Sequence, residues 1–163
     1  MVPSTVGLMR RLLIAVLVVS SLPAADSFYL GTWTIASAVV APWADPAARP
    51  PDPREMKSLI GRTIIVRPGE MIGPGIFACK GPKYKVTDYP ADWLFQGQFG
   101  EMRDRDHTVD PAKLAAKLGF KGTSWKTLET GCANEIDYHF VDADTAEIGL
   151  NDYVYTLKRK PGN

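Results

Sequence analysis

Carboxylates and an imidazole lie close together in the middle of the chain, in a pattern that metal sites can use. Asp104, Asp106 and His107 are followed by Asp110. Calcium needs about six to eight oxygen ligands on a glycine-hinged loop, which this stretch lacks. Zinc needs more nitrogen or sulfur ligands than the two histidines of this chain supply. The pattern therefore favours a polar loop before a helix, and we expect neither a metal nor another cofactor.

A second group of titratable residues lies near the C-terminus. Asp137, His139 and Val141 alternate along an expected strand and so share one of its faces. A structural role between strands is the favoured interpretation of His139, and contact with a ligand or a heme is the alternative. Asp137 and Glu147 could form an acid and base pair, but no phosphate loop, dinucleotide fingerprint, nucleophile elbow or zinc-protease motif accompanies them. We therefore do not expect an enzyme.

The only two cysteines are Cys79 and Cys132. In an exported protein such a pair predicts a disulfide. The alternative is that Cys132 acts as a nucleophile with His139 as its base, but no local catalytic signature supports this pairing.

Aromatic residues are spread over the expected strands and loops, which favours a hydrophobic core. The alternative is that some of them form the wall of a ligand cavity, because a barrel of about eight strands is just wide enough to hold one small ligand. The residues that we expect to contact such a ligand are Trp43, Trp93, Tyr84, Tyr138 and His139, with the first two at the mouth.

The first 27 residues have the pattern of an export signal. Arg10 and Arg11 precede the apolar run 12–19, which ends at serines and Pro23. The run is too short to span a membrane, which takes about 20 apolar residues. We expect cleavage after Ser27 and a periplasmic or secreted protein. Residues 28–163 then form a single domain.

The expected mature chain is electrically balanced. Removal of residues 1–27 leaves 17 basic (19 − 2) and 17 acidic (18 − 1) residues. A nucleic-acid-binding surface would need a basic stripe, so nucleic acid is not an expected partner.

The rest of the chain reads mainly as strands separated by turn residues. Short links such as 142–144 and 151–152 force neighbouring strands to be antiparallel. Asp110, Pro111 and Gly119 frame one short helix over 110–118. Strands are expected at 31–40, 62–67, 70–72, 76–79, 83–89, 124–130, 135–141, 145–150 and 153–159, with a helical turn at 54–60. The fold class is thus all-β, an antiparallel up-and-down barrel of about eight strands with one short α-helix.

Five prolines within residues 42–53 predict a stiff loop after the first strand. A structural loop is the favoured interpretation, and a lid over the open end of the barrel is the alternative.

Gly31 and Trp33 on the first strand, with Arg159 late in the last strand, resemble the calycin group of lipocalins and fatty-acid-binding proteins. In that group a Gly-x-Trp packs against an arginine or lysine of the last strand. The resemblance implies that Arg159, or alternatively Lys158, covers the indole of Trp33 and closes the barrel floor. The stretch from Gly131 to Leu157 also resembles small exported proteins of bacteria, which imply no activity.

The lipocalin-like interpretation implies an exported binding protein for a small apolar or amphipathic ligand. Two alternatives remain open: a protein-binding module, such as an inhibitor of an exported hydrolase, and a structural accessory of the cell envelope. The volume of the interior separates the ligand-binding protein from the protein-binding module, because a filled interior would exclude a ligand there.

Overall fold

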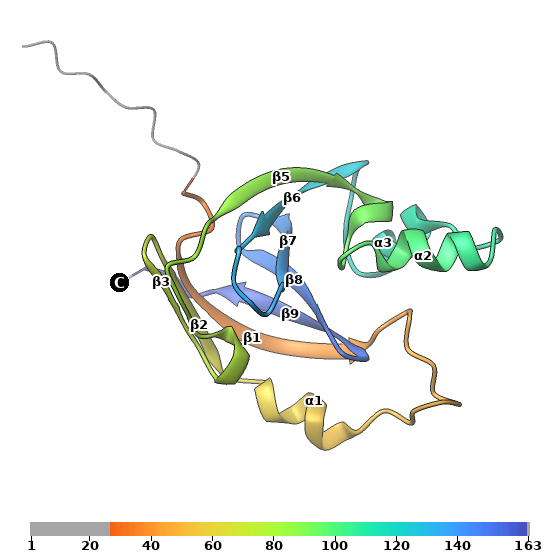
Figure 1. The fold of residues 1–163 in the computed structure, drawn as a ribbon, viewed down its shortest axis with the longest axis horizontal. Coiled ribbons are helices and arrows are strands. Elements are labelled where there is room, and N and C mark those ends of the chain that lie inside the picture. Colours follow the sequence, from red (N-terminus) through yellow and green to blue (C-terminus); the bar gives the residue numbers. More distant parts are fainter. Residues whose placement is uncertain (1–26, 163) are drawn as a thin grey trace, which may run out of the picture.

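The computed structural model describes residues 27–162, so the expected export signal lies almost entirely outside the described residues. Nine strands form one antiparallel sheet with the order β4-β3-β2-β1-β9-β8-β7-β6-β5 (Figure 1). The strands are β1 (Gly31–Val40), β2 (Thr63–Arg67), β3 (Glu70–Ile72), β4 (Cys79–Lys80), β5 (Lys85–Pro90), β6 (Ser124–Glu129), β7 (Asp137–Asp142), β8 (Thr145–Leu150) and β9 (Tyr153–Arg159). The helical segments are α1 (Pro53–Leu59), α2 (Gln98–Arg105) and α3 (Pro111–Lys117), with the 3-10 turns η1 (Gly75–Phe77) and η2 (Ala91–Trp93).

The mainly β, antiparallel meander predicted by the sequence is confirmed. Strands that follow one another in the chain pair, except β4 with β5. Strand β1 also pairs with β9, from Trp33 opposite Arg159 to Val40 opposite Tyr153. The sheet has nine strands rather than about eight. It curls into a half-barrel whose two edges, β4 and β5, follow one another in the chain but do not pair.

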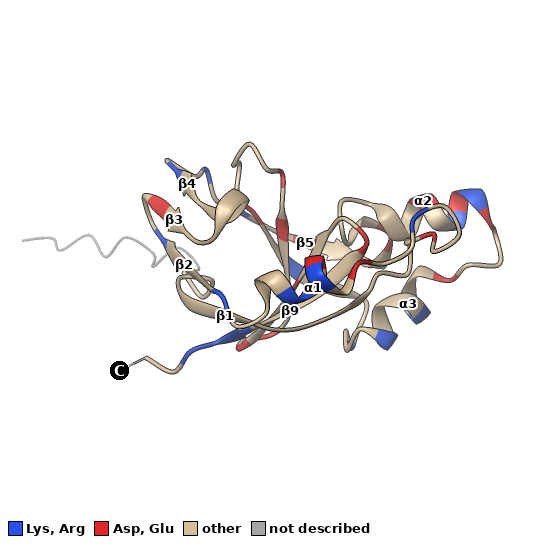
Figure 2. Cartoon of the chain, turned by 90° about the horizontal axis from the view of Figure 1, so that it is seen from below, with Lys and Arg blue, Asp and Glu red and all other residues tan. Residues whose placement is uncertain are grey.

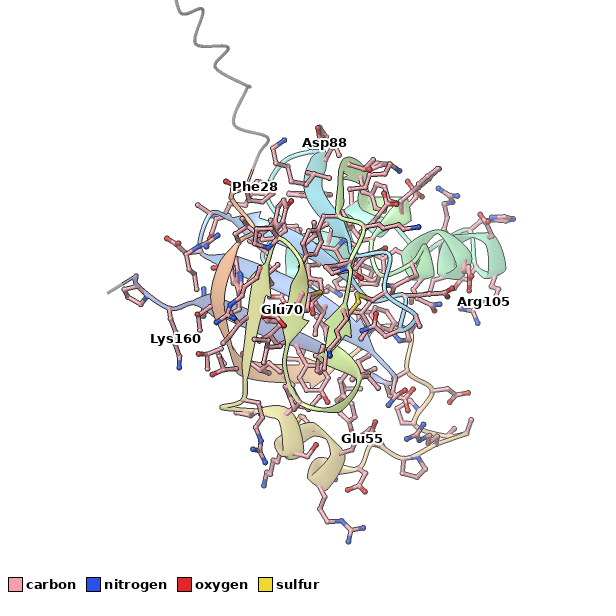
Figure 3. The ribbon with its side chains drawn as sticks, turned by 60° about the vertical axis from the view of Figure 1, so that its left-hand side comes forward. Phe28, Glu55, Glu70, Asp88, Arg105 and Lys160 are labelled. Carbon is pink, nitrogen blue, oxygen red and sulfur yellow. A yellow bond between two sulfur atoms is a disulfide. The ribbon has the colours of Figure 1, made fainter. Side chains whose placement is uncertain are left out.

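The seam between β4 and β5 is held by other contacts. The predicted disulfide joins Cys79 to Cys132 with a Cα–Cα distance of 6.1 Å (Figure 3). Beside it, the Tyr84 hydroxyl donates to the carbonyl of Arg67 at 2.9 Å. Strand β4 has only two residues, and Pro82, which follows it closely, has no backbone N–H with which to extend a ladder.

The two ends of the described chain meet at the floor of the half-barrel, as the resemblance implied. The guanidinium carbon of Arg159 lies 4.2 Å from the ring centroid of Trp33. Arg159 also donates to the carbonyls of Leu30, at 2.8 Å, and of Phe28. The Trp33 indole donates to the carbonyl of Tyr29 at 3.0 Å, which holds the entry of the chain against the sheet.

The inner face of the curled sheet is packed with apolar and aromatic side chains. Residues from β2 and β3 share this cluster with residues from β6 to β9, which shows that it fills the space inside the curl. Met56 and Leu59 of α1 pack against the same cluster. Its fully buried large members include Trp33, Ile35, Ile64, Phe77, Leu128, Ile148, Tyr153, Tyr155 and Leu157.

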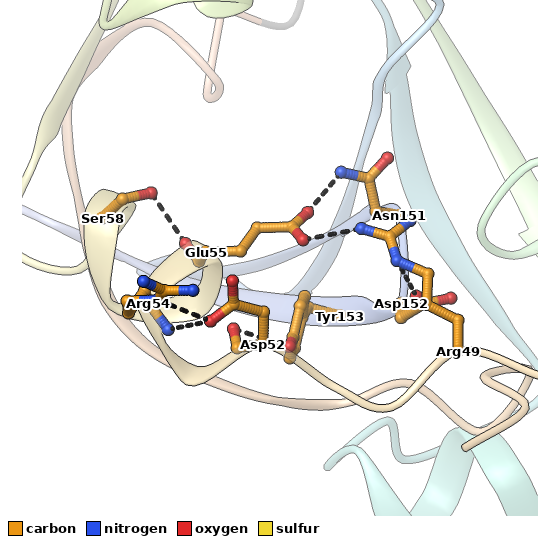
Figure 4. Close-up of polar contacts among 8 residues, drawn as sticks. All are labelled: Arg49, Asp52, Arg54, Glu55, Ser58, Asn151, Asp152 and Tyr153. Atoms are coloured by element: carbon orange, nitrogen blue, oxygen red, sulfur yellow. Dashed lines mark hydrogen bonds and ion pairs between the residues drawn. The ribbon is translucent and has the colours of Figure 1, made fainter. Parts of the chain in front are cut away.

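The proline-rich segment before α1 is fastened to the β8–β9 turn (Figure 4). Arg49 contacts Glu55 at 2.9 Å and Asp152 at 3.5 Å. The amide of Asn151 donates to the same Glu55 at 2.5 Å, and the Tyr153 hydroxyl donates to the carbonyl of Asp52 at 2.9 Å. These contacts fit the structural loop that was the favoured interpretation of this segment.

A second apolar cluster covers the outer face of the sheet. Helices α2 and α3 lie together to one side of the curled sheet in Figure 1. The cluster joins Phe99 of α2 and Ala115 of α3 to Trp125 of β6 and Val154 of β9. Helix α3 is the helix that the sequence predicts, with the Asp110 side chain accepting from the backbone N–H of Ala112 at 2.9 Å. The sequence does not predict α2.

Candidate functional site

A cleft of about 720 Å³ lies between the outer face of the sheet and the helical layer. One wall comes from β5, the end of β6, the start of β7 and the loop 130–135. The other wall comes from η2, the turn after it and α2. The side chains that decide its chemistry are the aromatic Tyr89 and Trp93 and the charged Asp92, Glu101, Arg103, Asp104, Glu129, Glu135 and Asp137.

Trp93 is the most exposed large hydrophobic side chain among the described residues, with 61% of its surface open to solvent. The indoles of the other three tryptophans donate to backbone carbonyls: Trp33 to Tyr29, Trp43 to Asn151 and Trp125 to Lys121. Within residues 27–162, the Trp93 indole N–H has no such partner. Its ring meets that of Tyr89 edge to face, with centroids 5.6 Å apart. Trp93 therefore offers both a ring face and a hydrogen-bond donor to a ligand.

The turn that carries Trp93 into α2 has an uncommon backbone. Phe95, Gln96 and Gly97 all have positive φ angles, of 53°, 56° and 82°. On the facing wall, Glu135 also has a positive φ of 54°, and the Gln96 amide donates to its carbonyl at 3.2 Å. Non-glycine residues in this region cost about 1 to 3 kcal/mol each and persist only where the surroundings hold them. Such strained residues are concentrated at binding and catalytic sites, and here they are found in both walls of one cleft.

His139 holds this turn in place. Its Nε2 accepts the backbone N–H of Phe95 at 2.8 Å. The remaining ring proton is therefore on Nδ1, which donates to the hydroxyl of Thr127 at 2.8 Å. Complete burial lowers the pKa of His139 to about 3, so the ring is neutral. Both ring nitrogens are engaged in hydrogen bonds within the protein, so His139 is a positioning residue for the cleft wall.

Two carboxylates lie directly opposite one another where β6 ends and β7 begins, because Glu129 is the register partner of Asp137. Glu129 accepts from Thr87 at 2.8 Å, from Tyr89 at 3.1 Å and from Lys85 at 3.1 Å. The bond from Thr87 is the largest of the effects that hold the pKa of Glu129 below its usual value.

Asp137 has the opposite environment. Among the described residues, no side chain forms a hydrogen bond or an ion pair with its carboxylate. Burial, followed by the charges of Glu129 and Glu135, raises the pKa of Asp137 to about 6.

Carboxylates outnumber cations in the cleft. The one arginine in the lining, Arg103, is engaged by Asp92 and by Asp104, the latter at 3.0 Å. Helix α2 accordingly carries both blue and red segments in Figure 2. Glu101, Glu135 and Asp137 remain without an ion-pair partner in the described part of the chain. The cleft therefore presents negative charge beside an exposed indole.

The residues expected to contact a ligand are not gathered at one place. Trp93 lines the cleft, and His139 supports its wall from below. Trp43 packs against Phe95, with ring centroids 5.2 Å apart. Tyr84 lies at the seam, and Tyr138 belongs to the inner core.

Sequence reasoning does not single out Tyr89, Gln96, Glu129 or Glu135 as site residues. The alternating pattern of residues 83–89 indicates which side chains share a face of that strand. It does not indicate that the outer face carries a helical wall. Only the pairing of β5, β6 and β7 brings Tyr89, Glu129 and Asp137 to one surface.

The acidic side chains Asp106 and Asp110, in the polar loop before α3, accept hydrogen bonds from residues close to them in the chain. Asp106 accepts from both the backbone N–H and the hydroxyl of Thr108, at 2.9 and 2.7 Å. Asp110 caps α3. Within residues 27–162, no group of three or more histidine, cysteine or acidic side chains is placed to hold a metal ion.

Fold and site together define an antiparallel half-barrel with a helix-walled, acidic and aromatic cleft on its outer face. No known family matches the chain, and neither the curated proteins nor the solved structures contain a significant match to it. Across residues 27–162, no helix has both the length and the apolar character that crossing a membrane requires.

Proposed function

We propose that this protein binds a small amphipathic cation in the cleft beside Trp93. The single observation that carries the proposal is the combination of an exposed, unbonded indole with carboxylates that lack a cationic partner, in one cleft of about 720 Å³. The apolar body of the ligand would lie on Trp93, and its ammonium or guanidinium group would face Asp137 and Glu135. This narrows the ligand class from apolar or amphipathic molecules to amphipathic cations.

The packing of the inner face supports an outer site. A second surface hollow, of about 520 Å³, adjoins the Cys79–Cys132 disulfide. The inner cluster is filled by buried apolar and aromatic side chains, and its Tyr138 and Tyr155 hydroxyls have no hydrogen-bond partner there. Neither of these tyrosines lines either hollow.

The chemistry of the cleft favours a cation over a neutral molecule. A cation over an indole gains about 0.5 to 2 kcal/mol, depending on how far it is desolvated. Carboxylates in a partly buried cleft add charge-assisted hydrogen bonds, which are stronger than neutral ones. A neutral aromatic molecule could use the indole but would leave these carboxylates without partners.

We further infer that the protein works outside the cytoplasm. The Cys79–Cys132 disulfide supports this, since such bonds persist in oxidising compartments and are rare in reducing ones. The basic and apolar pattern of residues 1–27 points the same way.

Calorimetry with matched probes tests the proposed function. Phenethylamine, which is protonated at neutral pH, should bind at pH 7.5, and the neutral phenethyl alcohol should bind at least tenfold more weakly. Trp93→Ala should weaken phenethylamine binding. Asp88→Asn serves as the control, because Asp88 lies on the same strand as Tyr89 but does not line the cleft. Equal affinity for the two probes would refute the proposal.

A further inference from the structure

We propose that the Glu129–Asp137 pair makes the cleft a proton-operated binding site, which holds its cation when Asp137 is ionised and releases it when Asp137 takes up a proton. The inference rests on the proposed function, since it concerns the regulation of the same cleft. The two carboxylates have different roles: Asp137 takes up the proton, and Glu129 stays ionised.

The geometry of the sheet forces the two carboxylates together. Glu129 and Asp137 are a directly opposed cross-strand pair on the outer face. The Cβ atoms of such pairs are about 4.5 to 5.5 Å apart, and like charges in these positions destabilise one another. One proton on either group removes the repulsion, so the pair has a built-in preference for a singly protonated state.

The hydrogen-bond donors decide which group takes the proton. Glu129 collects the ammonium of Lys85 and the hydroxyls of Thr87 and Tyr89. All three donors favour its ionised form. Asp137 has no such donor among the described residues, and it is half-buried, which disfavours its charged form. Asp137 is therefore the carboxylate of the pair that takes up the proton more readily. The raised pKa of Asp137 and the lowered pKa of Glu129 agree with this assignment.

The remaining charges around Asp137 set how strongly it resists ionisation. Lys85 of β5 favours its ionised form, whereas Glu129 of β6 and Glu135 of the preceding loop oppose it. The cleft also contains charged groups from its helical wall. These are Asp92 of η2 and Glu101, Arg103 and Asp104 of α2. Acidic groups predominate, so an incoming cation would relieve repulsion and release the proton of Asp137.

The expected size of the effect follows from the fraction of Asp137 that is ionised. If the cation binds only the ionised form, apparent affinity is multiplied by that fraction. With the pKa of Asp137 at about 6, the fraction is nearly complete at pH 7.5 and about one-tenth at pH 5. The affinity should therefore fall about tenfold between these two pH values.

Phenethylamine is a suitable probe for the switch because it stays protonated throughout this range. We expect its dissociation constant, measured by calorimetry, to rise about tenfold from pH 7.5 to pH 5 with the wild-type protein. Asp137→Asn should bind weakly at both pH values, with little pH dependence. The control Asp88→Asn should retain the wild-type response. Glu129→Gln removes the opposed charge and should move the release to lower pH.

A ligand-free measurement complements the binding data. The carboxyl ¹³C resonance of Asp137 should titrate near pH 6 in the wild-type protein and at lower pH in Glu129→Gln. Two results would overturn the switch and leave the proposed function standing. One is binding by the wild-type protein that is equally strong at pH 5 and pH 7.5. The other is a fall in the affinity of Asp137→Asn between these pH values as large as that of the wild type. The absence of phenethylamine binding at pH 7.5 would overturn both.

Discussion

Glu147 is a carboxyl group buried beneath the helical layer, and it gives a test of how the outer face is built. Only 5% of its surface is exposed, and the Thr156 hydroxyl donates to it at 3.2 Å. Burial raises the pKa of Glu147 from 4.5 to about 7. The folded state therefore favours the neutral form. Its contribution to stability is complete below about pH 4.5 and is lost as the pH rises through 7.

Glu147→Gln should consequently stabilise the protein at pH 8 relative to the wild type. Removing the cost of ionising a buried carboxyl is worth about 3 kcal/mol, since each pKa unit corresponds to about 1.4 kcal/mol. Urea unfolding at pH 5 and pH 8 would measure the difference, with Asp88→Asn, at an exposed carboxylate, as a control. If Glu147→Gln and the wild type showed the same pH dependence, the carboxyl would not be buried as described.

His139 gives the opposite dependence on pH. Its pKa falls from 6.5 to about 3 in the folded protein, so its contribution to stability is present above pH 6.5 and is lost as the pH falls toward 3. His139→Gln should flatten the loss of stability on the acid side. A His139→Leu variant, which has no acceptor atom, should also weaken phenethylamine binding at pH 7.5, because the backbone N–H of Phe95 loses its acceptor. Acid titration followed by circular dichroism, together with calorimetry, would check both expectations.

The pairing of the first and last strands is the element-scale feature with the clearest energetic consequence. Trp33→Ala should lower the free energy of unfolding by about 3 to 5 kcal/mol, as for other buried large aromatics. It removes the indole under Arg159 and leaves a cavity in the inner core. Trp93→Ala is the matched control, because Trp93 is mostly exposed and its loss should change stability little. Urea unfolding curves of the two variants should therefore separate clearly.

Beside the unpaired edges of β4 and β5, the disulfide ties β4 to the loop between β6 and β7. Cys79 and Cys132 are separated by 53 residues. Closing a loop of that length stabilises a protein by about 4 kcal/mol in the chain-entropy model. Replacing both cysteines by alanine should cost a similar amount in urea unfolding. A loss below about 1 kcal/mol would show that the contacts of Tyr84 hold the seam without the disulfide.

Several elements could be predicted from the sequence because local signals determine them. Strands β8 and β9 match their expected ranges, since short turns delimit them. Asp110 and Pro111 likewise mark the start of α3. The sequence does not predict helix α2, because Gly100 lies within it and glycine disfavours a helix interior. A Cβ at Gly100 would lie 2.9 Å from the carbonyl oxygen of Asp92, so this glycine serves a close contact with η2.

At the scale of the whole molecule, the proposed site lies on the outside of the half-barrel, whereas the sequence-based hypothesis has a ligand in its interior. Inner and outer faces cannot be distinguished by alternation alone, because both faces of β6 to β9 are covered. For this reason the sequence could place His139 and Asp137 on one face but could not indicate that this face lies under a helical layer. The register of β6 against β7, which alternation within each strand does not determine, brings Glu129 opposite Asp137.

The four indole N–H groups report directly on whether a ligand binds in the cleft beside Trp93. Three of them are bonded to backbone carbonyls, whereas that of Trp93 has no partner in the described chain. In ¹H–¹⁵N correlation spectra at pH 7.5, phenethylamine should shift the Trp93 indole signal in a saturable manner and leave those of Trp33 and Trp125 in place. A saturable shift at Trp33 without one at Trp93 would contradict the account and place the ligand inside the half-barrel.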